Sequence, residues 1–566
     1  MHQPNVQPHA SSYFKYEVYP FECPADLSSP TTLRHPVVIV GAGPAGLVLA
    51  IQMALNGVKS VLIESEAQVS GGSRALALTK RSMEIMEQCG VAAEFLQGAL
   101  VWKDGYSFYK NRIVHHLDIP YAEDDKFHPM TNLAQCIMEK ILVDRARALG
   151  VEIRFQTRLE SMDVAEGGVT LTVDTPEGEY RMLADWVVAC DGARSAVRRL
   201  QGLRFEGQSY ESRFVIADFN IALDEPTGRR CYFEPPWLPG HTALVHKAPG
   251  GVWRLDYQVP ADVSDEEALD PNRIHAHIQA QLDYVGVKLP WTVEWTTLYK
   301  PNTLTLSSYN HGRVLYCGDS AHLLPVFGVR GMNTGIQDSI NLGWKLAAVV
   351  QAQAQPAMLD SFSSERVADA RQICQEAGRS TRMVAPPTRG FRVMQQAVLS
   401  LALNHEFPRG LLHWRTSHPI DYASSPLTWH DATDSSFAAG PRPGAPARNA
   451  KLAEGFLLDA FEPGFHILVF GQGAAQWQAA CEDMHQLRAK NLRVRLIAVR
   501  TDNTPAPGAD AVLHDPQGHV HKMWGAHDGT VYVLRPDQHV CARWTAASTT
   551  RAAQVIHYVL SVQPAT

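Results

Sequence analysis

The uncharged run at residues 37–55, VVIVGAGPAGLVLAIQMAL, constrains the fold of this chain more than any other segment. Its length is about that of a membrane-spanning helix. Three glycines and Pro44 interrupt it, however, so residues 37–40 are typical of a buried strand, and the turn after them leads into a helix that ends near Asn56. The run therefore predicts a strand, a tight turn and a helix in the core of a parallel sheet.

The turn has the pattern Gly-x-Gly-x-x-Gly of a dinucleotide-binding βαβ unit. Gly41 allows the tight turn, Gly43 lets the backbone approach a pyrophosphate, and Gly46 lets the helix pack on the strand. Ala45 belongs to the same predicted site. Glu64 ends the second strand, about 20 residues on, where an acidic side chain can bind a ribose hydroxyl. The pattern leaves the choice between NAD and FAD open.

A second segment, residues 185–195, is an apolar strand that ends in Asp191 and Gly192 and precedes a helix start. An ordinary Asp-Gly turn would give the same pattern. A third segment, residues 313–338, has Gly318-Asp319 after an apolar strand, and capping-box form at Thr334-Gly335-Ile336-Gln337. An amphipathic helix is expected to begin at Thr334, and the positive end of its dipole would stabilise a nearby negative charge by up to ~2 kcal/mol.

In these three segments the chain resembles the single-component FAD-dependent aromatic hydroxylases, the group that includes phenol hydroxylase and 3-(3-hydroxyphenyl)propionate hydroxylase. The resemblance covers about residues 36–545. It implies FAD as the cofactor, NADH or NADPH as co-substrate, and oxygen transfer from a C4a-hydroperoxyflavin to a phenol or phenolic acid. Two alternatives stay open: a Baeyer–Villiger or epoxidising monooxygenase that acts on an aromatic polyketide, and a flavin-binding sensor that is not an enzyme.

The resemblance also implies flavin contacts residue by residue. Asp319 would accept a hydrogen bond from the ribityl chain, and the backbone of residues 331–333 would lie beside the isoalloxazine ring. Arg74 would lie near the phosphates. The predicted cofactor-binding residues are Gly41, Gly43, Ala45, Gly46, Glu64, Arg74, Gln135, Asp191, Gly192, Asp319, Pro325, Gly331, Met332 and Asn333.

The loop before the expected helix departs from the family pattern. Where many members read P-P-x-x-G-Q-G-M/L-N, this chain reads P-V-F-G-V-R-G-M-N from Pro325 to Asn333. Arg330 thus adds a positive charge near the flavin. It could bind an anionic substrate, stabilise a flavin peroxide, or point into solvent.

Residues 205–300 contain short alternating runs, at residues 214–221, 242–246 and 252–259, which predict an antiparallel sheet. In the family such a sheet forms a wall of the substrate pocket. A phenolic ring is most reactive as phenolate, so some group must accept the hydroxyl proton. The candidate catalytic residues are Tyr232, His246, Arg254, Tyr257 and Arg330, with His241 as a further candidate; the sequence does not rank them.

The predicted fold class is α/β: a Rossmann-like FAD-binding fold of the GR2 type, an inserted antiparallel β-sheet substrate domain, and a C-terminal thioredoxin-like domain. The nine cysteines contain no Cys-x-x-Cys pair, so this last domain has no dithiol redox centre and is expected to serve packing or dimer contact. The predicted parts are residues 1–34 (an extension, strap or tail), 35–204 and 301–400 (FAD-binding domain), 205–300 (substrate domain), 401–446 (helical and irregular segment with a linker) and 447–566 (thioredoxin-like domain).

Charge and cysteine usage narrow the partners. Lys and Arg number 51 and Asp and Glu 58, which gives a net charge of −7 without a basic tract. No nucleic-acid or membrane partner is therefore expected, and no metal site. Residues 1–34 do not resemble a secretory signal, and isolated cysteines fit reduced cytoplasmic thiols. The sequence predicts a cytoplasmic homodimer whose partners are a small aromatic substrate, O2 and NAD(P)H.

Overall fold

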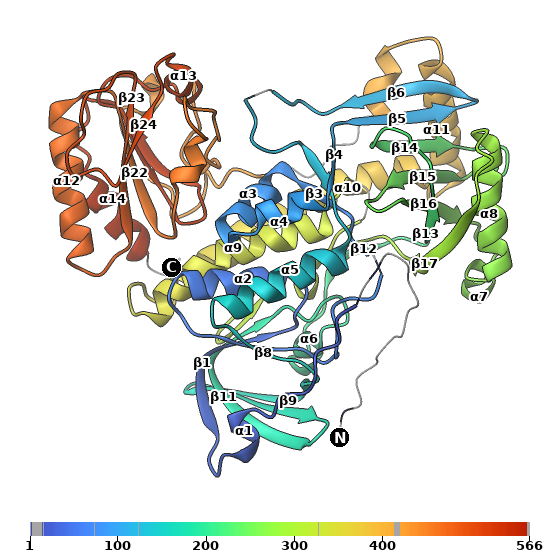
Figure 1. Ribbon diagram of the computed structural model, residues 1–566, viewed down its shortest axis with the longest axis horizontal. Coiled ribbons are helices and arrows are strands. Elements are labelled where there is room, and N and C mark those ends of the chain that lie inside the picture. The colour runs from blue at the N-terminus through green and yellow to red at the C-terminus, as the bar shows by residue number, and fades with distance from the viewer. Residues whose placement is uncertain are drawn as a thin grey trace.

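The structure, a computed structural model, describes residues 2, 14, 16–72, 74–122, 124–325, 328–412 and 419–562. Figure 1 shows a central group of helices on a sheet, a second sheet with helix α8 at one side, and a C-terminal α/β unit at the other. The predicted α/β class is confirmed. Within the described residues, no helix combines the length and the apolar character that crossing a membrane requires.

The first sheet brings the three sequence motifs to one edge. Its strand order is β19-β20-β11-β1-β2-β8, with β10 paired to β11 and β9 to β10. Strands β2 and β11 are parallel to β1, and β20 is parallel to β11. Because the carboxyl ends of parallel strands meet at one edge, Gly41, Glu64, Asp191 and Gly318 lie close together there. The strands are β1 (Leu33–Val40), β2 (Val61–Ile63), β8 (Glu152–Arg154), β9 (Arg158–Ala165), β10 (Gly168–Thr175), β11 (Gly178–Ala189), β19 (Asn310–His311) and β20 (Val314–Tyr316).

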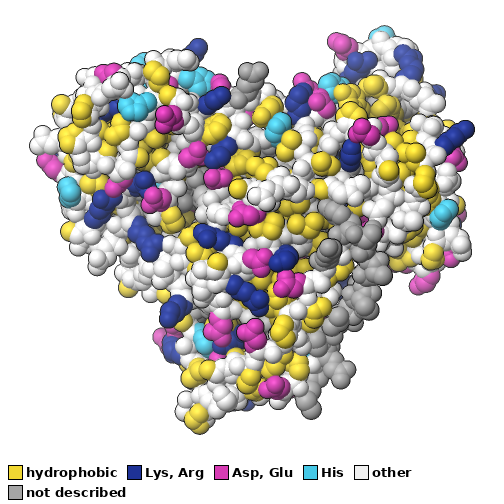
Figure 2. All heavy atoms as spheres, in the orientation of Figure 1, with side chains coloured by type: hydrophobic (Ala, Val, Ile, Leu, Met, Phe, Trp, Pro, Cys, Tyr) yellow, Lys and Arg dark blue, Asp and Glu magenta, His cyan; other side chains and the backbone are white. Residues whose placement is uncertain are grey.

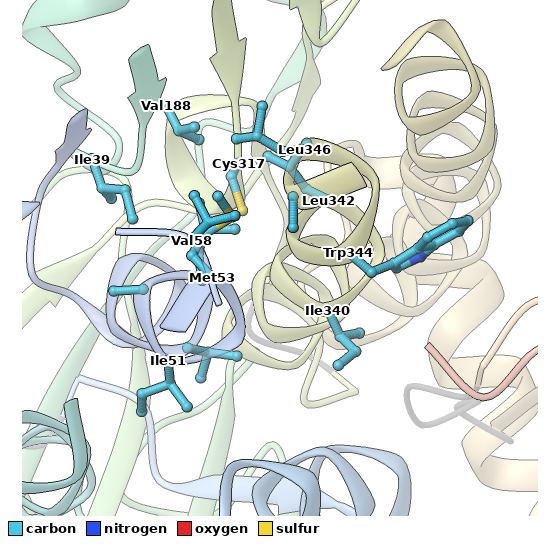
Figure 3. Packing of buried hydrophobic residues seen from close by; sticks show 14 of the residues in the cluster. Ile39, Ile51, Met53, Val58, Val188, Cys317, Ile340, Leu342, Trp344 and Leu346 are labelled. Carbon is cyan, nitrogen blue, oxygen red and sulfur yellow. The ribbon is translucent and has the colours of Figure 1, made fainter. Parts of the chain in front are cut away.

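Helices α2 (Pro44–Leu55) and α9 (Gly331–Val350) pack on this sheet. Figure 3 shows Val188 and Cys317 of the sheet side, Met53 of α2 and Leu342 of α9 around one apolar interior, while Trp344 points away from it. The first four side chains are fully buried. Burial of this kind contributes about 25 cal/mol per Å² of apolar surface removed from water.

The predicted start of α9 at Thr334 is wrong, because the helix begins at Gly331. The Thr334 N–H already donates to the Arg330 carbonyl (2.8 Å), so Thr334 lies in the first turn rather than at the cap. Asn333 anchors this turn by accepting a hydrogen bond from the Thr79 N–H and donating one to the Ala77 carbonyl (both 2.9 Å).

The remaining elements around the first sheet complete this unit. Within the predicted extension, residues 16–32 lie as a strap: Tyr19 stacks on Phe155 with ring centroids 4.1 Å apart, and the Tyr16 hydroxyl accepts a hydrogen bond from the Gly72 N–H (2.7 Å). Residues 33 and 34 belong to β1. Two small sheets have the orders β3-β7-β4 and β12-β18-β21. The elements are α1 (Ala25–Ser28), α3 (Lys80–Cys89), α4 (Ala92–Gln97), α5 (Gln135–Ala148), α6 (Ala196–Leu200), α10 (Met358–Val384), α11 (Arg389–Ala402), β3 (Ala77–Thr79), β4 (Leu100–Trp102), β7 (Met130–Asn132), β12 (Glu206–Ser209), β18 (Asn302–Thr305) and β21 (His322–Leu323).

The second sheet is larger than the sequence predicts. Its order is β17-β13-β16-β15-β14-β5-β6, so two strands come from residues 104–118, which were assigned to the FAD-binding domain. It is also not wholly antiparallel, because β5 extends the β14 edge in parallel. Helices α7 (Asp265–Ala268) and α8 (Pro271–Tyr284) accompany it. The strands are β5 (Asp104–Tyr109), β6 (Arg112–Asp118), β13 (Arg213–Ile221), β14 (Arg229–Phe233), β15 (Thr242–Lys247), β16 (Val252–Val259) and β17 (Trp291–Tyr299).

The C-terminal unit contains a five-stranded sheet of order β24-β23-β22-β25-β26. Strands β22 and β23 are parallel and joined by α12, and β25 and β26 form an antiparallel hairpin before α14. This βαβ unit followed by a hairpin and a helix is the topology of a thioredoxin-like domain. All nine cysteines are free. The elements are β22 (Phe465–Phe470), α12 (Ala474–Arg488), β23 (Val494–Arg500), β24 (Ala511–His514), α13 (His519–Trp524), β25 (Val531–Leu534), β26 (Val540–Trp544) and α14 (Ala552–Leu560).

A buried group of charges joins the C-terminal unit to α9 and α10. Arg535, in the β25–β26 turn, donates two hydrogen bonds to Glu365 of α10 (2.6 and 3.0 Å), and Lys345 of α9 donates to the same carboxylate (2.7 Å). The Trp344 indole N–H donates to Asp537 (3.1 Å). Burial alone would raise the pKa of Glu365, but Arg535 and Lys345 hold it below its ordinary value. The hairpin of the C-terminal unit thus holds the helix whose first turn borders the site described next.

Candidate active site

A cavity of about 1580 Å³ lies between the carboxyl edge of the first sheet and the second sheet. Its walls include Gly41 and Asp319 on one side and Arg254 on the other. Pockets for small ligands commonly measure roughly 300–1,000 Å³. The cavity therefore has room for a dinucleotide and a second small molecule.

The glycine-rich turn shows why each glycine is needed. At Gly41 the backbone has φ +107°, and an added Cβ would lie 2.5 Å from the Cys190 carbonyl oxygen. At Gly46 a Cβ would lie 2.0 Å from the Gly41 carbonyl oxygen, so helix and strand would be forced apart. At Gly43 a Cβ would meet no atom within 4 Å, although this residue borders the cavity. This open cradle at the N-terminus of α2 fits a pyrophosphate.

Glu64 lies at the same edge and borders the cavity. Its carboxylate accepts hydrogen bonds from the backbone N–H groups of Ala42 (2.8 Å) and Glu66 (3.0 Å). These contacts hold the glycine-rich turn against β2. The proposed contact of Glu64 with a ribose stays a prediction.

Arg74 and Gln135 also border the cavity. Arg74 is exposed, whereas the Gln135 side chain accepts a hydrogen bond from the Ala75 N–H (3.0 Å) and donates one to Glu139 (2.8 Å). Glu139, which no sequence motif singled out, also borders the cavity, and burial raises its pKa to about 7 despite hydrogen bonds from Gln135 and Ser70. No local pattern distinguishes it from any other glutamate of a helix.

The second and third motifs face the cavity together. Asp191 borders it beside Gly192, and its Oδ1 atom has no hydrogen-bond partner among the described residues. Burial raises the pKa of Asp191. Asp319 is exposed to the cavity, and a Cβ on Gly331 would lie 4.0 Å from its Oδ1 atom. The Asp191 and Asp319 carboxyl groups can accept hydrogen bonds from hydroxyl groups of a ligand. This pair therefore fits the polar part of a dinucleotide.

A buried network supports the loop that carries Asp319. Asp338 of α9 accepts a hydrogen bond from the Gly318 N–H (3.0 Å), lies 2.7 Å from His322 Nε2, and accepts another from Arg366 (2.6 Å). Burial raises the pKa of Asp338, but the opposing effects of Arg366 and His322 are larger and bring this pKa below its ordinary value. Asp338 therefore positions the loop without lining the cavity.

Residues 331–333 border the cavity at the positive end of α9, and their place beside a flavin ring stays a prediction. Arg330 is only 2% exposed and forms an ion pair with Glu376 at 3.4 Å, so the option that it points into solvent is wrong. Val329 has φ +60°, a left-handed conformation that favours glycine. Pro325 is buried, and residues 326 and 327 lie outside the described part of the loop.

The second sheet divides the candidate catalytic residues between its two faces. His246 and Arg254 border the cavity. Tyr232 and Tyr257 lie on the other face, in an apolar cluster with residues of α8, where Tyr257 stacks on His277 (4.5 Å). His241 lies in the turn before β15 and is not among the residues that line the cavity.

Two further polar residues of this cavity wall, Arg229 and Asp256, were missed by the sequence analysis. Successive side chains of a strand point to opposite faces, so Arg254 and Asp256 share a face that Tyr257 does not. The strand β16 was predicted correctly, at residues 252–259. Applying this alternation to that strand would have placed Asp256 with Arg254 and separated Tyr257 from both.

Comparisons with known proteins identify the family of this chain. A model of the FAD binding domain family matches residues 34–377, more than half of the chain, and a model of the HcaD C-terminal domain matches residues 448–558. The 3-(3-hydroxy-phenyl)propionate/3-hydroxycinnamic acid hydroxylase of Mycolicibacterium smegmatis is 29% identical over 525 residues, which cover 89% of each chain.

Two solved structures share the fold over nearly the whole chain. The flavin-dependent monooxygenase PieE, in complex with FAD and substrate, has a TM-score of 0.75 and 23% identity, with 93% of this chain and 99% of that chain covered. Aklavinone-11 hydroxylase, in a ternary complex with FAD and aklavinone, has a TM-score of 0.72 and 25% identity, with 94% and 99% covered. The predicted FAD cofactor is confirmed. The chain belongs to the FAD binding domain family and, within it, to the single-component FAD-dependent hydroxylases.

Proposed function

We propose that the protein uses FAD, NAD(P)H and O2 to hydroxylate a phenolic aromatic compound, with phenolic acids as the first candidates. The observation that carries the proposal is one cavity with the FAD motifs on one wall and a polar wall of Arg229, His246, Arg254 and Asp256 on the other. The relative from Mycolicibacterium smegmatis is named for a phenolic acid substrate.

Bound FAD, once reduced by NAD(P)H, supplies the activated oxygen. The residues of this chain bind and orient the reactants around it. The glycine-rich turn and Arg74 would hold the phosphates, and Asp191 and Asp319 the hydroxyl groups of the cofactor. The first turn of α9 would stabilise negative charge on the ring by up to ~2 kcal/mol. The second sheet would exclude water from the reacting atoms.

Arg330 and Arg254 are the cations we propose to act on an anionic substrate or phenolate. Both border the cavity and both already pair with a carboxylate, Glu376 and Asp218 respectively. The carboxylate partly neutralises each cation, so each would act on a ligand less as a full unit charge than as a hydrogen-bonding group. Such groups orient a ligand by hydrogen bonds.

A larger phenolic substrate is a second candidate, favoured by the cavity volume of about 1580 Å³. Aklavinone-11 hydroxylase, which the chain resembles at 25% identity, binds aklavinone. Baeyer–Villiger oxygenation or epoxidation of such a compound would leave no new ring hydroxyl, so the product identifies the reaction.

The test is a substrate panel with the purified yellow protein. Phenols, phenolic acids and polycyclic phenols are each supplied while NADH or NADPH consumption, O2 uptake and products are recorded together. We expect at least one phenolic acid to stimulate coenzyme oxidation and to yield a hydroxylated product in step with O2 uptake. If no compound stimulates coenzyme oxidation, the protein is not a hydroxylase of this kind and the sensor alternative gains support.

We also propose that the protein works in the cytoplasm, where NAD(P)H is supplied, and as a homodimer. Large apolar side chains are exposed on neighbouring elements, α11 and the 3-10 helix η2 (Phe407–Leu412). Figure 2 shows hydrophobic side chains at the upper right, where Figure 1 places β5, β6 and α11. Contiguous exposed apolar surface is typical of protein interfaces. Light scattering of the holoenzyme measures the oligomeric state. The exposed residues are Val393, Met394, Leu401, Phe407 and Leu411.

A further inference from the structure

A row of polar side chains crosses the cavity wall of the second sheet. Arg229 of β14 pairs in register with His246 of β15, His246 with Arg254 of β16, and Arg254 with Asp218 of β13. Arg254 donates two hydrogen bonds to Asp218, at 2.8 and 3.0 Å. Asp256 lies two residues beyond Arg254 on the same face and borders the cavity.

The hydrogen bonding of the Asp256 side chain is incomplete. Its side chain is 10% exposed, and its Oδ1 atom has no hydrogen-bond partner among the described residues. His246 Nε2 lies 3.8 Å from Oδ2, which is beyond hydrogen-bond distance. Buried carboxyl oxygens are nearly always hydrogen-bonded. An incompletely bonded carboxyl in a cavity wall indicates a ligand that brings a donor, such as a hydroxyl group.

On the basis of the proposed function, we propose that Asp256 is the catalytic base that accepts the proton of the substrate's phenolic hydroxyl, with His246 beside it as a second hydrogen-bonding group. The proton passes from the hydroxyl to the Asp256 carboxylate, and the electron pair stays on the ring oxygen. A C–O bond would then form as the O–O bond of the activated oxygen breaks, and the leaving oxygen would take the electron pair and a proton from water. The hydrogen of the attacked carbon leaves to water, and the Asp256 proton returns to the ring oxygen as aromaticity is restored.

The surrounding charges favour this exchange. The charged groups around Asp256 are Arg229, Arg254 and Asp218, whose charges sum to +1. One anion therefore balances the wall: the Asp256 carboxylate before proton transfer, and the phenolate after it. Because the charge moves only from one wall oxygen to a neighbouring ligand oxygen, no new buried charge is created.

The acidities fit the same assignment. Burial, opposed by Arg254 and Arg229 and assisted by Asp218, raises the pKa of Asp256 to about 7. A base is most effective when its pKa lies near the working pH. Burial, with Arg229 and Arg254, lowers the pKa of His246 well below its ordinary value, so His246 stays neutral and is the weaker base.

The experiment compares Asp256→Asn with wild-type holoenzyme on two kinds of substrate. With a phenol that is un-ionised at the assay pH, we expect turnover to fall by roughly 10²–10⁴-fold. With 4-nitrophenol at about pH 8, where it is already ionised, the loss should be less than about tenfold, because no proton needs to be removed. In the wild type, turnover of the un-ionised phenol should rise through about pH 7, as Asp256 ionises. Equal losses with both substrates, or no loss, would overturn the proposal.

A binding titration gives a readout that does not depend on turnover. Absorbance of 4-nitrophenol reports whether the ligand bound to the holoenzyme is phenol or phenolate. Wild-type affinity for the phenolate should fall as the pH rises above about 7, because ionised Asp256 repels it, and Asp256→Asn should remove this dependence. Identical titrations for both proteins would contradict the assignment. If no phenol stimulates coenzyme oxidation in the wild type, the proposed function fails, while this titration still tests Asp256.

Asp283→Asn is the matched control, since it makes the same chemical change at an exposed position of α8. It should leave turnover and both titrations unchanged. If Asp256→Asn does not retain FAD, Asp256→Glu keeps a carboxyl group at the site. That variant should shift the midpoint of the pH profile, and an unchanged midpoint would count against Asp256 as the base.

Discussion

Arg535→Met is expected to destabilise the folded protein by about 3–5 kcal/mol, the usual cost of removing one partner from a buried ion pair. Glu365 and Asp537 are 1% and 0% exposed at their side chains, and both lose their arginine in this variant. The Glu365 and Asp537 carboxylates would stay buried with too few positive charges and hydrogen-bond donors around them. Because the hairpin that carries Arg535 holds α9, flavin release should accompany unfolding. Denaturant titration followed by circular dichroism and flavin fluorescence measures both events.

Arg551→Met is the control for this prediction. Arg551 belongs to the same domain and also pairs with two acidic residues, Asp483 and Glu482, but its side chain is 42% exposed. Its loss should cost less than the loss of Arg535, because Arg551 and Glu482 are exposed and only Asp483 would be left buried. Similar effects of the two substitutions would show that the buried charges do not dock the C-terminal unit.

Acid should reduce the difference in unfolding free energy between the wild type and Arg535→Met. The pKa of Glu365 is held below its ordinary value of 4.5, so the stability it contributes is fully present above about pH 4.5. That contribution is lost as the pH falls through the lower pKa that Glu365 has in the folded protein. A difference that stayed constant down to strong acid would exclude Glu365 as the source.

Gly46→Ala is expected to weaken FAD binding by at least about tenfold and to lower the stability of the apoprotein as well. A Cβ at this position would lie 2.0 Å from the Gly41 carbonyl oxygen, so the backbone of the turn must move. Forced overpacking of this kind costs typically about 1–3 kcal/mol, and 1.4 kcal/mol corresponds to a tenfold change in affinity. Flavin absorbance after desalting and the melting temperature of the apoprotein measure the two effects.

Gly43→Ala separates cofactor contact from protein packing. Gly43 has φ −72°, which alanine adopts readily, and its Cβ would meet no protein atom within 4 Å. The apoprotein should therefore melt within about 1 °C of wild type, since surface changes without lost contacts cost little. FAD affinity should nevertheless fall, because the methyl group enters the space we assign to the pyrophosphate. Full retention of FAD affinity would place the pyrophosphate elsewhere.

Much of the cofactor side of the site could be predicted from local sequence. Gly46 is required by a distance within the turn, Gly41 has a positive φ there, and Asp191 and Gly318 each follow a buried apolar strand. Such signals are local because neighbouring residues of a strand and a turn build them. The start of α9 was misplaced because Thr334 and Gln337 have capping-box form, whereas the contacts of Asn333 with β3 extend the helix to Gly331.

The substrate side could be predicted only in outline. The sequence predicted the strands β13, β15 and β16. Tyr257 was nevertheless grouped with Arg254, because the candidates were chosen by residue type and not by the face of the sheet. Strands β5 and β6 joined this sheet from another part of the chain. No local sequence pattern predicts the pairing of strands that lie this far apart in the chain.

By itself, the sequence determined that this chain contains a dinucleotide-binding α/β unit, because a strand, a glycine-rich turn and a helix encode that unit within about 30 residues, and the resemblance carried by three segments pointed to FAD. Only the tertiary structure decided which polar side chains share the cavity. Asp218, Arg229, His246 and Asp256 come from four strands, and only register and alternation bring them to one face. The pKa of Asp256 also depends on burial and on charges from neighbouring strands, which exist only after the sheet has formed.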